Sequence, residues 1–214
     1  MKYIFFDLDG TLTDPFRGIT NSVIYALEKM GYPHGENSEY RLFIGPPLRE
    51  SFAKKCGMTA EEAERALALY REYFSPVGIF ENRVYDGVPE MLEELKNQGY
   101  TIVLATSKPR IYAGRILEKF DLMKYFSGVF GSELDGTRDR KDEVIGYALE
   151  ILGASPDDVI MVGDRLHDVL GAKAHGIKTV GVLFGYGTAD ELTEAGAVAL
   201  AENTDELYDC ITSF

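Results

Sequence analysis

This 214-residue sequence has few of the residues and segments on which several classes of protein depend. Its two cysteines, Cys56 and Cys210, lie far apart and outside any C-x-x-C pair, so we predict neither a disulfide framework nor a zinc site. Its three histidines form no metal-binding spacing. No segment approaches the roughly 20 apolar residues of a membrane span, and the first apolar stretch stops at Asp7, too early for a signal-peptide core.

Basic residues are also scarce, because 22 lysines and arginines face 35 acidic residues and give a formal net charge of -13. This balance argues against partners that need basic patches, which are nucleic acid polymers and anionic membranes. An acidic protein can still bind an anionic metabolite if a metal ion, a lysine or a helix N-terminus inverts the field locally. With no heptad seam and no obvious self-pairing edge, we expect a monomer or weak homodimer that binds a small molecule. The two cysteines are expected to be reduced, as in a cytoplasmic protein.

Hydrophobic residues make up 45% of the chain, and many of them fall in short runs that end in polar residues. Such runs are typical of buried strands that lead into loops. Four of them are clear, and a fifth over residues 128–131 is weaker; the clear runs are Tyr3–Leu8, Thr101–Ala105, Val159–Val162 and Lys178–Leu183. Helical patterns separate them, at Val88–Gln98, Arg110–Phe120 and Asp142–Leu152. Strands that alternate with helices predict an α/β fold with a mostly parallel sheet.

One region breaks this alternation, because residues 16–80 contain helical patterns and no convincing strand. Apolar residues lie near helical spacing from Ile19 to Met30, and Ala60–Phe74 has strong helix composition. This block directly follows the first strand. We therefore predict a helical insert of residues 15–84 in a core formed by residues 1–14 and 85–214.

The strongest functional signal is the segment DLDGT at residues 7–11, where Asp7 and Asp9 follow the first strand. Ligands of open parallel sheets bind at the carboxyl ends of strands, and unpaired buried carboxylates are costly. Mg²⁺ would resolve that cost, because it prefers carboxylate oxygens. A calcium loop of the EF-hand type is excluded, because its sixth and twelfth positions would be Leu12 and Gly18. A solvated acidic turn remains possible for this segment alone.

Three further polar sites fall at strand ends or helix starts. Thr106 and Ser107 follow the second strand, and Asp164 and Asp168 occur in GDRLHD after a later one. Taken alone, Asp164 could simply cap the helix that follows it. Lys141 lies in a charged run that could be a solvated face, but it also precedes a helix and could point toward a bound phosphate.

These segments, in this order, resemble the four motifs of the haloacid dehalogenase-like (HAD) superfamily. They are DLDGT at 7–11, the strand that ends in Thr106, Lys141 before a helix, and GDRLHD at 163–168. The resemblance implies a Rossmann-like core formed by residues 1–14 and 85–214, with a small α-helical cap domain at 15–84 inserted after the first strand. Single motifs are weakly specific, but four in order with such an insert are highly specific.

The resemblance also implies roles for individual residues. Asp7 would be the nucleophile that forms an aspartyl-phosphate, and Asp9 would be the general acid and base. Thr106 and Lys141 would hold phosphoryl oxygens. Mg²⁺ would be bound by Asp7, by Asp164 and by the backbone carbonyl of Asp9. Asp168 would support these ligands without binding the ion directly. Because dehalogenases of this superfamily lack the second aspartate, Asp9 favours a phosphate ester as substrate.

A closer resemblance, to phosphoglycolate phosphatases and bacterial 5′-nucleotidases, rests on Ile44–Leu48 and on Gly185-Tyr186-Gly187. The sequence has Thr106-Ser107-Lys108 where Thr-Asn-Lys is commonest, which weakens an inference for glycolate specifically. Ser107, Lys108 and Arg49 are further candidates for substrate binding, although Arg49 could equally be a surface residue. The predicted function is Mg²⁺-dependent hydrolysis of 2-phosphoglycolate, a nucleoside monophosphate or a sugar phosphate. A phosphomutase resembling β-phosphoglucomutase is the alternative, and a non-catalytic binding module ranks lower.

Overall fold

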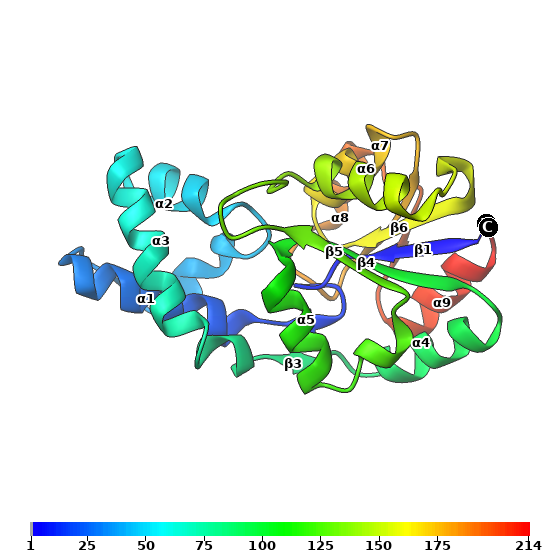
Figure 1. Ribbon diagram of the computed structural model, residues 1–214, viewed down its shortest axis with the longest axis horizontal. Helices are drawn as coiled ribbons and strands as arrows, with labels where there is room; N and C mark the ends of the chain where they lie inside the picture. The colour runs from blue at the N-terminus through cyan, green and yellow to red at the C-terminus, as the bar shows by residue number, and fades with distance from the viewer. Residues whose placement is uncertain (1) are drawn as a thin grey trace. The chain divides into compact units, whose positions relative to one another are not determined.

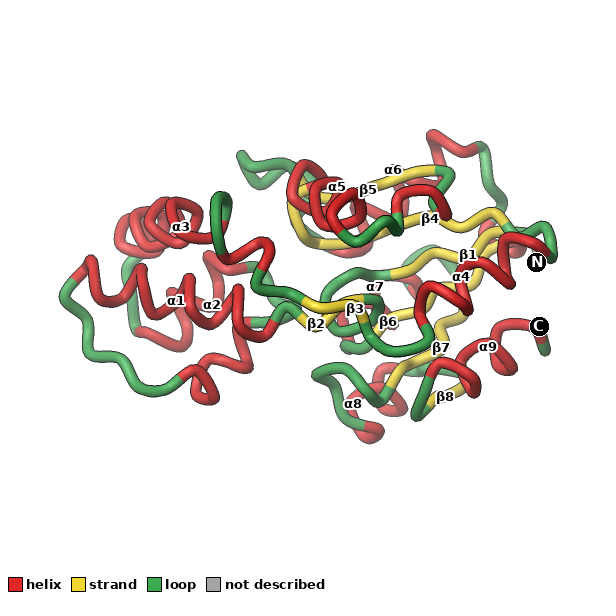
Figure 2. The backbone as a smooth tube through the Cα atoms, turned by 90° about the horizontal axis from the view of Figure 1, so that it is seen from below, coloured by secondary structure: helices red, strands yellow, loops and turns green. Residues whose placement is uncertain are grey.

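The computed structural model describes residues 2–214, and the chain divides into two compact units. One unit joins Met1–Asp14 to Val84–Phe214, and the other is Pro15–Arg83. In Figure 2 the six-stranded sheet belongs to the first unit, and the second is built from helices. None of the helices formed by residues 2–214 combines the length and the apolar character that crossing a membrane requires.

The first unit is built on a six-stranded sheet with the order β5-β4-β1-β6-β7-β8, in which every neighbouring pair is parallel. The α/β fold with a parallel sheet predicted from the sequence is thus confirmed. The sixth strand, β8, was not expected, because three residues are too few to form a recognisable apolar run. The strands are β1 (Tyr3–Phe6), β4 (Thr101–Pro109), β5 (Gly128–Ser132), β6 (Val159–Gly163), β7 (Lys178–Val182) and β8 (Ala199–Ala201).

Helices cover both faces of this sheet, as Figure 1 shows. On one face lie α6 (Lys141–Leu152) and α7 (Leu166–Lys173), and α8 (Ala189–Ala195) packs against α7. On the other lie α4 (Val88–Asn97), α5 (Arg110–Lys119) and α9 (Thr204–Thr212). Two 3₁₀ helices connect these elements, η3 (Met123–Tyr125) and η4 (Pro156–Asp158). Because both faces are covered, the strands read as continuous apolar runs rather than as alternating ones.

The core follows from the alternation of side chains along each strand. Phe5 of β1 packs with Val103 and Met161 of the neighbouring strands and with Val144 and Ile145 of α6. Ile4 and Phe6 of β1 are also fully buried. Burying a side chain of this size contributes about 1.5–3 kcal/mol, so the central strand is held firmly from both sides.

The register places the ends of the three central strands at one level. Phe6 of β1 pairs with Leu104 of β4 and with Val162 of β6. Asp7 follows the end of β1, Asp164 follows the end of β6, and Thr106 lies in the last part of β4, so this register brings the three residues to the same edge. This edge is the carboxyl end of the sheet, where open α/β folds bind their ligands.

The second unit is a set of packed helices. Its α1 (Phe16–Met30) and α2 (Leu48–Cys56) both pack against α3 (Ala60–Phe74), and it also contains the 3₁₀ helices η1 (Asn37–Phe43) and η2 (Gly78–Phe80). Thr59 starts α3 with a capping box, since its hydroxyl accepts the Glu62 N–H. Residues 16–80 form no strand, as the sequence predicts. Two short strands, β2 (Thr13–Asp14) and β3 (Arg83–Val84), pair where the chain leaves the first unit and returns to it.

Candidate active site

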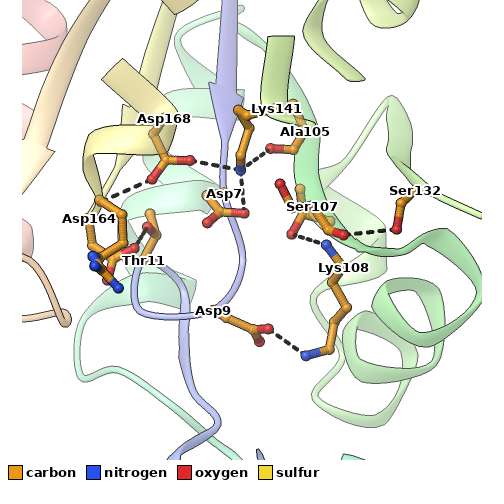
Figure 3. A network of polar contacts seen from close by, with 12 residues as sticks. Asp7, Asp9, Thr11, Ala105, Ser107, Lys108, Ser132, Lys141, Asp164 and Asp168 are labelled. Carbon is orange, nitrogen blue, oxygen red and sulfur yellow. Dashed lines mark hydrogen bonds and ion pairs between the residues drawn. The ribbon is translucent and has the colours of Figure 1, made fainter. Parts of the chain in front are cut away.

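Asp7 lies one residue beyond the end of β1 and is still fixed to the sheet, because its N–H donates to the Val162 carbonyl at 2.9 Å. The residue is only 6% exposed. A carboxylate at such a place needs a positive partner. Lys141 supplies it, with its Nζ 2.8 Å from Asp7 Oδ1 (Figure 3).

Lys141 is the first residue of α6 and is almost fully buried. Its ammonium lies 2.8 Å from Asp7 Oδ1 and 2.7 Å from Asp168 Oδ1, and it donates to the Ala105 carbonyl at 3.0 Å. Burial alone would lower the pKa of Lys141, but the carboxylates of Asp168 and Asp7 outweigh burial and raise it above its usual range. Lys141 therefore stays a cation at the pH values at which enzymes work. It contacts residues from three separate segments of the chain, Asp7, Ala105 and Asp168.

Asp164 and Asp168 form the other side of this cluster, and both are fully buried. Asp164 directly follows β6, and Asp168 lies in the first turn of α7. Burial raises the pKa of Asp168 to about 6, because the lowering effect of Lys141 is smaller than the combined effect of burial and Asp7. Burial, together with the charges of Asp168 and Asp7, raises the pKa of Asp164 well above its usual range.

The charges of this cluster do not balance. Ligand oxygens of Asp7, Asp164 and Asp168 all lie within 4.8 Å of one another. When ionised they carry three negative charges, and Lys141 offsets one of the three, which leaves two. Asp168 has a donor on each oxygen, because Oδ1 faces Lys141 and Oδ2 accepts the Arg165 N–H at 3.0 Å. A divalent cation with a preference for oxygen ligands would fit beside Asp7 and Asp164 and would balance the remaining charge.

Asp9 takes part in a second, separate ion pair. Its Oδ2 lies 2.5 Å from Nζ of Lys108, and the two side chains are 12% and 6% exposed. Its Oδ1 is buried and has no hydrogen-bond partner among residues 2–214. Burial raises the pKa of Asp9, and Lys108 lowers it by less. The two aspartates of DLDGT thus have different charged partners, Lys141 for Asp7 and Lys108 for Asp9.

Polar groups in the last part of β4 complete the edge. Thr106 is 2% exposed, and its hydroxyl oxygen accepts the Lys108 N–H at 3.2 Å. The Ser107 carbonyl accepts the Ser132 hydroxyl at 2.8 Å, which ties this part of β4 to the end of β5 (Figure 3). The structure therefore gathers Thr106, Ser107 and Lys108 at the same strand end, with Lys108 turned toward Asp9.

Arg49 belongs to the second unit. It lies at the start of α2 in the helical unit, where its guanidinium forms an ion pair with Glu64 of α3. Two groups beside Asp164 went unrecognised as parts of the site in the sequence. The Thr11 hydroxyl lies 3.5 Å from Asp164 Oδ1, and the Tyr186 N–H donates to Asp164 Oδ2 at 2.8 Å. The useful signal for Tyr186 was its position just beyond the predicted strand Lys178–Leu183, at the same edge as the other motifs.

The sequence matches a known family over most of its length. Residues 4–182 match the family described as haloacid dehalogenase-like hydrolase. A 5′-nucleotidase of Pseudomonas aeruginosa is 46% identical over 189 residues, which are 88% of this chain and 86% of that protein. Tyrosine-protein kinase PtkA of Mycobacterium tuberculosis is 40% identical and is matched over 98% of this chain and 72% of its own. Phosphoglycolate phosphatase 1 of Pseudomonas aeruginosa is 29% identical over 98% of this chain and 79% of its own.

A solved structure supports the same relationship. The crystal structure of a predicted phosphatase from Clostridium acetobutylicum has a TM-score of 0.97 to this chain at 44% sequence identity. The match covers 100% of this chain and 99% of the other.

Proposed function

The chain belongs to the haloacid dehalogenase-like hydrolase family and is a phosphoric monoester hydrolase, and from this premise we propose that it hydrolyses small phosphate monoesters through an aspartyl-phosphate formed on Asp7. The observation that carries the proposal is the position of Lys141. One buried ammonium lies within 2.8 Å of Asp7 and 2.7 Å of Asp168, at the carboxyl end of the central strands. A cation in that place can offset part of the negative charge of a carboxylate nucleophile and of an incoming phosphate dianion.

Mg²⁺ is part of the proposal. Asp7 and Asp164 would supply carboxylate oxygens and Asp9 its backbone carbonyl, while Asp168 holds Lys141 in place. The charge of the cluster supports this assignment, because two negative charges remain after Lys141 is counted. When bound, the ion would neutralise phosphoryl oxygens and so reduce their repulsion with the nucleophile.

In the first step a carboxylate oxygen of Asp7 attacks phosphorus, and the bond from phosphorus to the alcohol oxygen breaks. The leaving alcohol takes its proton from Asp9. Burial keeps the pKa of Asp9 raised, which favours the protonated form that this step needs. Thr106 and Lys141 hold the phosphoryl oxygens during the transfer.

In the second step a water molecule attacks the phosphorus of the aspartyl-phosphate and gives its proton to Asp9. The bond between Asp7 and phosphorus breaks, inorganic phosphate leaves, and the Asp7 carboxylate and the protonated Asp9 are restored. Lys108 stabilises the ionised Asp9 that this step uses as a base, since its ammonium lies 2.5 Å from Oδ2. One carboxyl group can therefore serve as acid and then as base.

The substrate class is a small metabolite, namely 2-phosphoglycolate, a nucleoside monophosphate or a sugar phosphate. The names of the P. aeruginosa relatives, 5′-nucleotidase and phosphoglycolate phosphatase 1, support the first two. We also propose that residues 15–84 act as a cap domain that sets specificity, with Arg49, Ser107 and Lys108 among the substrate contacts. Two free cysteines are consistent with a cytoplasmic enzyme.

Phosphate release from a panel of these metabolites, with and without Mg²⁺, tests the proposal. We expect one class to exceed the others in kcat/KM, a strict dependence on Mg²⁺, and loss of turnover in Asp7→Asn without loss of folding. Sugar phosphates are also analysed for isomers, because isomer formation without free phosphate would identify a phosphomutase instead. Turnover that persists in a chelator, or in Asp7→Asn, would contradict the mechanism.

A further inference from the structure

The loop after β7, residues 183–187, packs directly against Asp164. The Tyr186 N–H donates to Asp164 Oδ2 at 2.8 Å, which fixes one oxygen of this carboxylate. The loop approaches so closely because glycines flank Tyr186. A Cβ atom at Gly185 would lie 2.4 Å from Asp164 Cβ, and one at Gly187 would lie 2.0 Å from the Asp164 carbonyl oxygen.

The same loop is tied to other parts of the first unit. Its first residue, Leu183, donates its N–H to the Ala201 carbonyl at 2.9 Å. The ring of Phe184 meets the ring of Tyr85 edge to face, with 5.1 Å between centroids. The hydroxyl of Tyr186 donates a hydrogen bond to Asp14 Oδ1. The side chain of Tyr186 is thus held by Asp14 while its backbone holds Asp164.

We infer that Tyr186 is a positioning residue for the metal ligand Asp164, and that its hydrogen bond to Asp14 keeps the loop in the conformation that presents the Tyr186 N–H to the carboxylate. This inference rests on the proposed Mg²⁺-dependent function. It goes beyond that function by assigning a task to two residues, Asp14 and Tyr186, that the proposed mechanism does not use. The reason is geometric: the N–H of Tyr186 can orient Oδ2 only while the loop stays pressed against Asp164.

Orientation of a carboxylate ligand by a hydrogen-bonded neighbour contributes substantially to metal affinity. Loss of such a partner typically costs about 10–100-fold in affinity or activity. Removing the hydroxyl of Tyr186 leaves its N–H in place but removes one of the contacts that hold the loop, so we expect a loss of about 10-fold in Mg²⁺ affinity, at the lower end of that range. Excess Mg²⁺ should restore the activity, because the residue positions a ligand and does not take part in the reaction.

The test uses the full-length chain and titrates Mg²⁺, both by calorimetry and by turnover of p-nitrophenyl phosphate. Tyr186→Phe and Asp14→Ala should each weaken Mg²⁺ binding, and the double variant should be no worse than either, because both remove one shared hydrogen bond. Asp14→Asn keeps an acceptor oxygen for the tyrosine hydroxyl and should retain most of the affinity. The control is Tyr208→Phe, which removes a hydroxyl that binds Gln98 on the surface, and its Mg²⁺ affinity should be unchanged.

The outcomes separate this inference from the proposed function. If the unmodified protein neither binds Mg²⁺ nor depends on it, the proposed function fails and the inference fails with it. If the unmodified protein depends on Mg²⁺ but Tyr186→Phe has the same Mg²⁺ affinity, only the inference is overturned. The inference is likewise overturned if Tyr186→Phe only lowers the melting temperature, or if saturating Mg²⁺ does not restore its activity.

Discussion

Replacing Lys141 by methionine tests the electrostatic design of the site, because it removes the charge and keeps much of the side chain's length. At an effective dielectric constant of about 20, an ion pair separated by 2.8 Å is worth about 6 kcal/mol, and Lys141 takes part in two such pairs. Much of this is offset by the cost of burying the ammonium. Removing one partner of a buried pair typically costs about 3–5 kcal/mol, and we expect a loss of stability in this range near neutral pH without Mg²⁺.

The loss should depend on pH in a defined direction. Lys141 lowers the pKa of Asp168, which is nevertheless raised to about 6, so removing Lys141 raises that pKa further. An acid whose pKa is higher in the folded state destabilises the fold above that pKa, and the penalty disappears below the unfolded value of about 3.9. The difference between the two proteins should therefore shrink as the pH falls toward about 6 and stay nearly constant below it, because Asp168 is then protonated in both folded proteins.

The assay is urea unfolding followed by far-ultraviolet circular dichroism, since the chain contains no tryptophan. Lys54→Met is the matched control, because Lys54 forms an exposed pair with Glu50 one turn away in α2. Its expected cost is about 0.3–0.5 kcal/mol, with little change over the same pH range. A loss below about 1 kcal/mol for Lys141→Met, or a loss that does not vary with pH, would refute the reasoning.

Three further predictions concern the same edge of the sheet. Mg²⁺ should raise the melting temperature more at about pH 7.5 than at about pH 5, because protons compete for Asp164 and Asp168, whose pKa values are raised; a shift independent of pH would count against this site. Lys108→Met should move the pKa of Asp9 upward in the pH profile of kcat/KM, because Lys108 lowers that pKa, and an unmoved profile would separate Lys108 from the acid–base step. Gly10→Ala should weaken Mg²⁺ binding more than Gly31→Ala, as measured by calorimetry. Both glycines have positive φ, but a Cβ at Gly10 would lie 2.1 Å from Asp164 Oδ2, and one at Gly31 would contact nothing within 4 Å.

Much of the fold could be predicted because its elements are strongly patterned. β1 and β6 are apolar throughout, and each is followed by aspartate, so both the strands and the edge at which they end are visible in the sequence. The helices α8 and α9 and the strand β8 could not be predicted from apolar patterns in this way. Ala199–Ala201 has only three residues, and α8 has seven, which leaves too little periodicity to distinguish them from loops.

The sequence predicted which residues form the site better than it predicted which of them contact one another. The position of Asp7, Asp164 and Lys141 at strand ends and a helix start indicated that they would meet, and the structure brings them together. The sequence could not indicate that Lys141 would lie between Asp7 and Asp168, because the direction of a side chain depends on packing between α6 and α7. Nor could it pair Lys108 with Asp9, since these residues lie 99 positions apart.

The central claim is that Asp7 carries the phosphoryl group. Its most direct test is to mix the enzyme with Mg²⁺ and substrate, stop the reaction with acid within the first turnover, and map the phosphorylated peptide by mass spectrometry. We predict a phosphoryl group on Asp7 that disappears as phosphate is released, and none in Asp7→Asn. A phosphoryl group on another residue, or turnover with inversion of configuration at phosphorus, would contradict it.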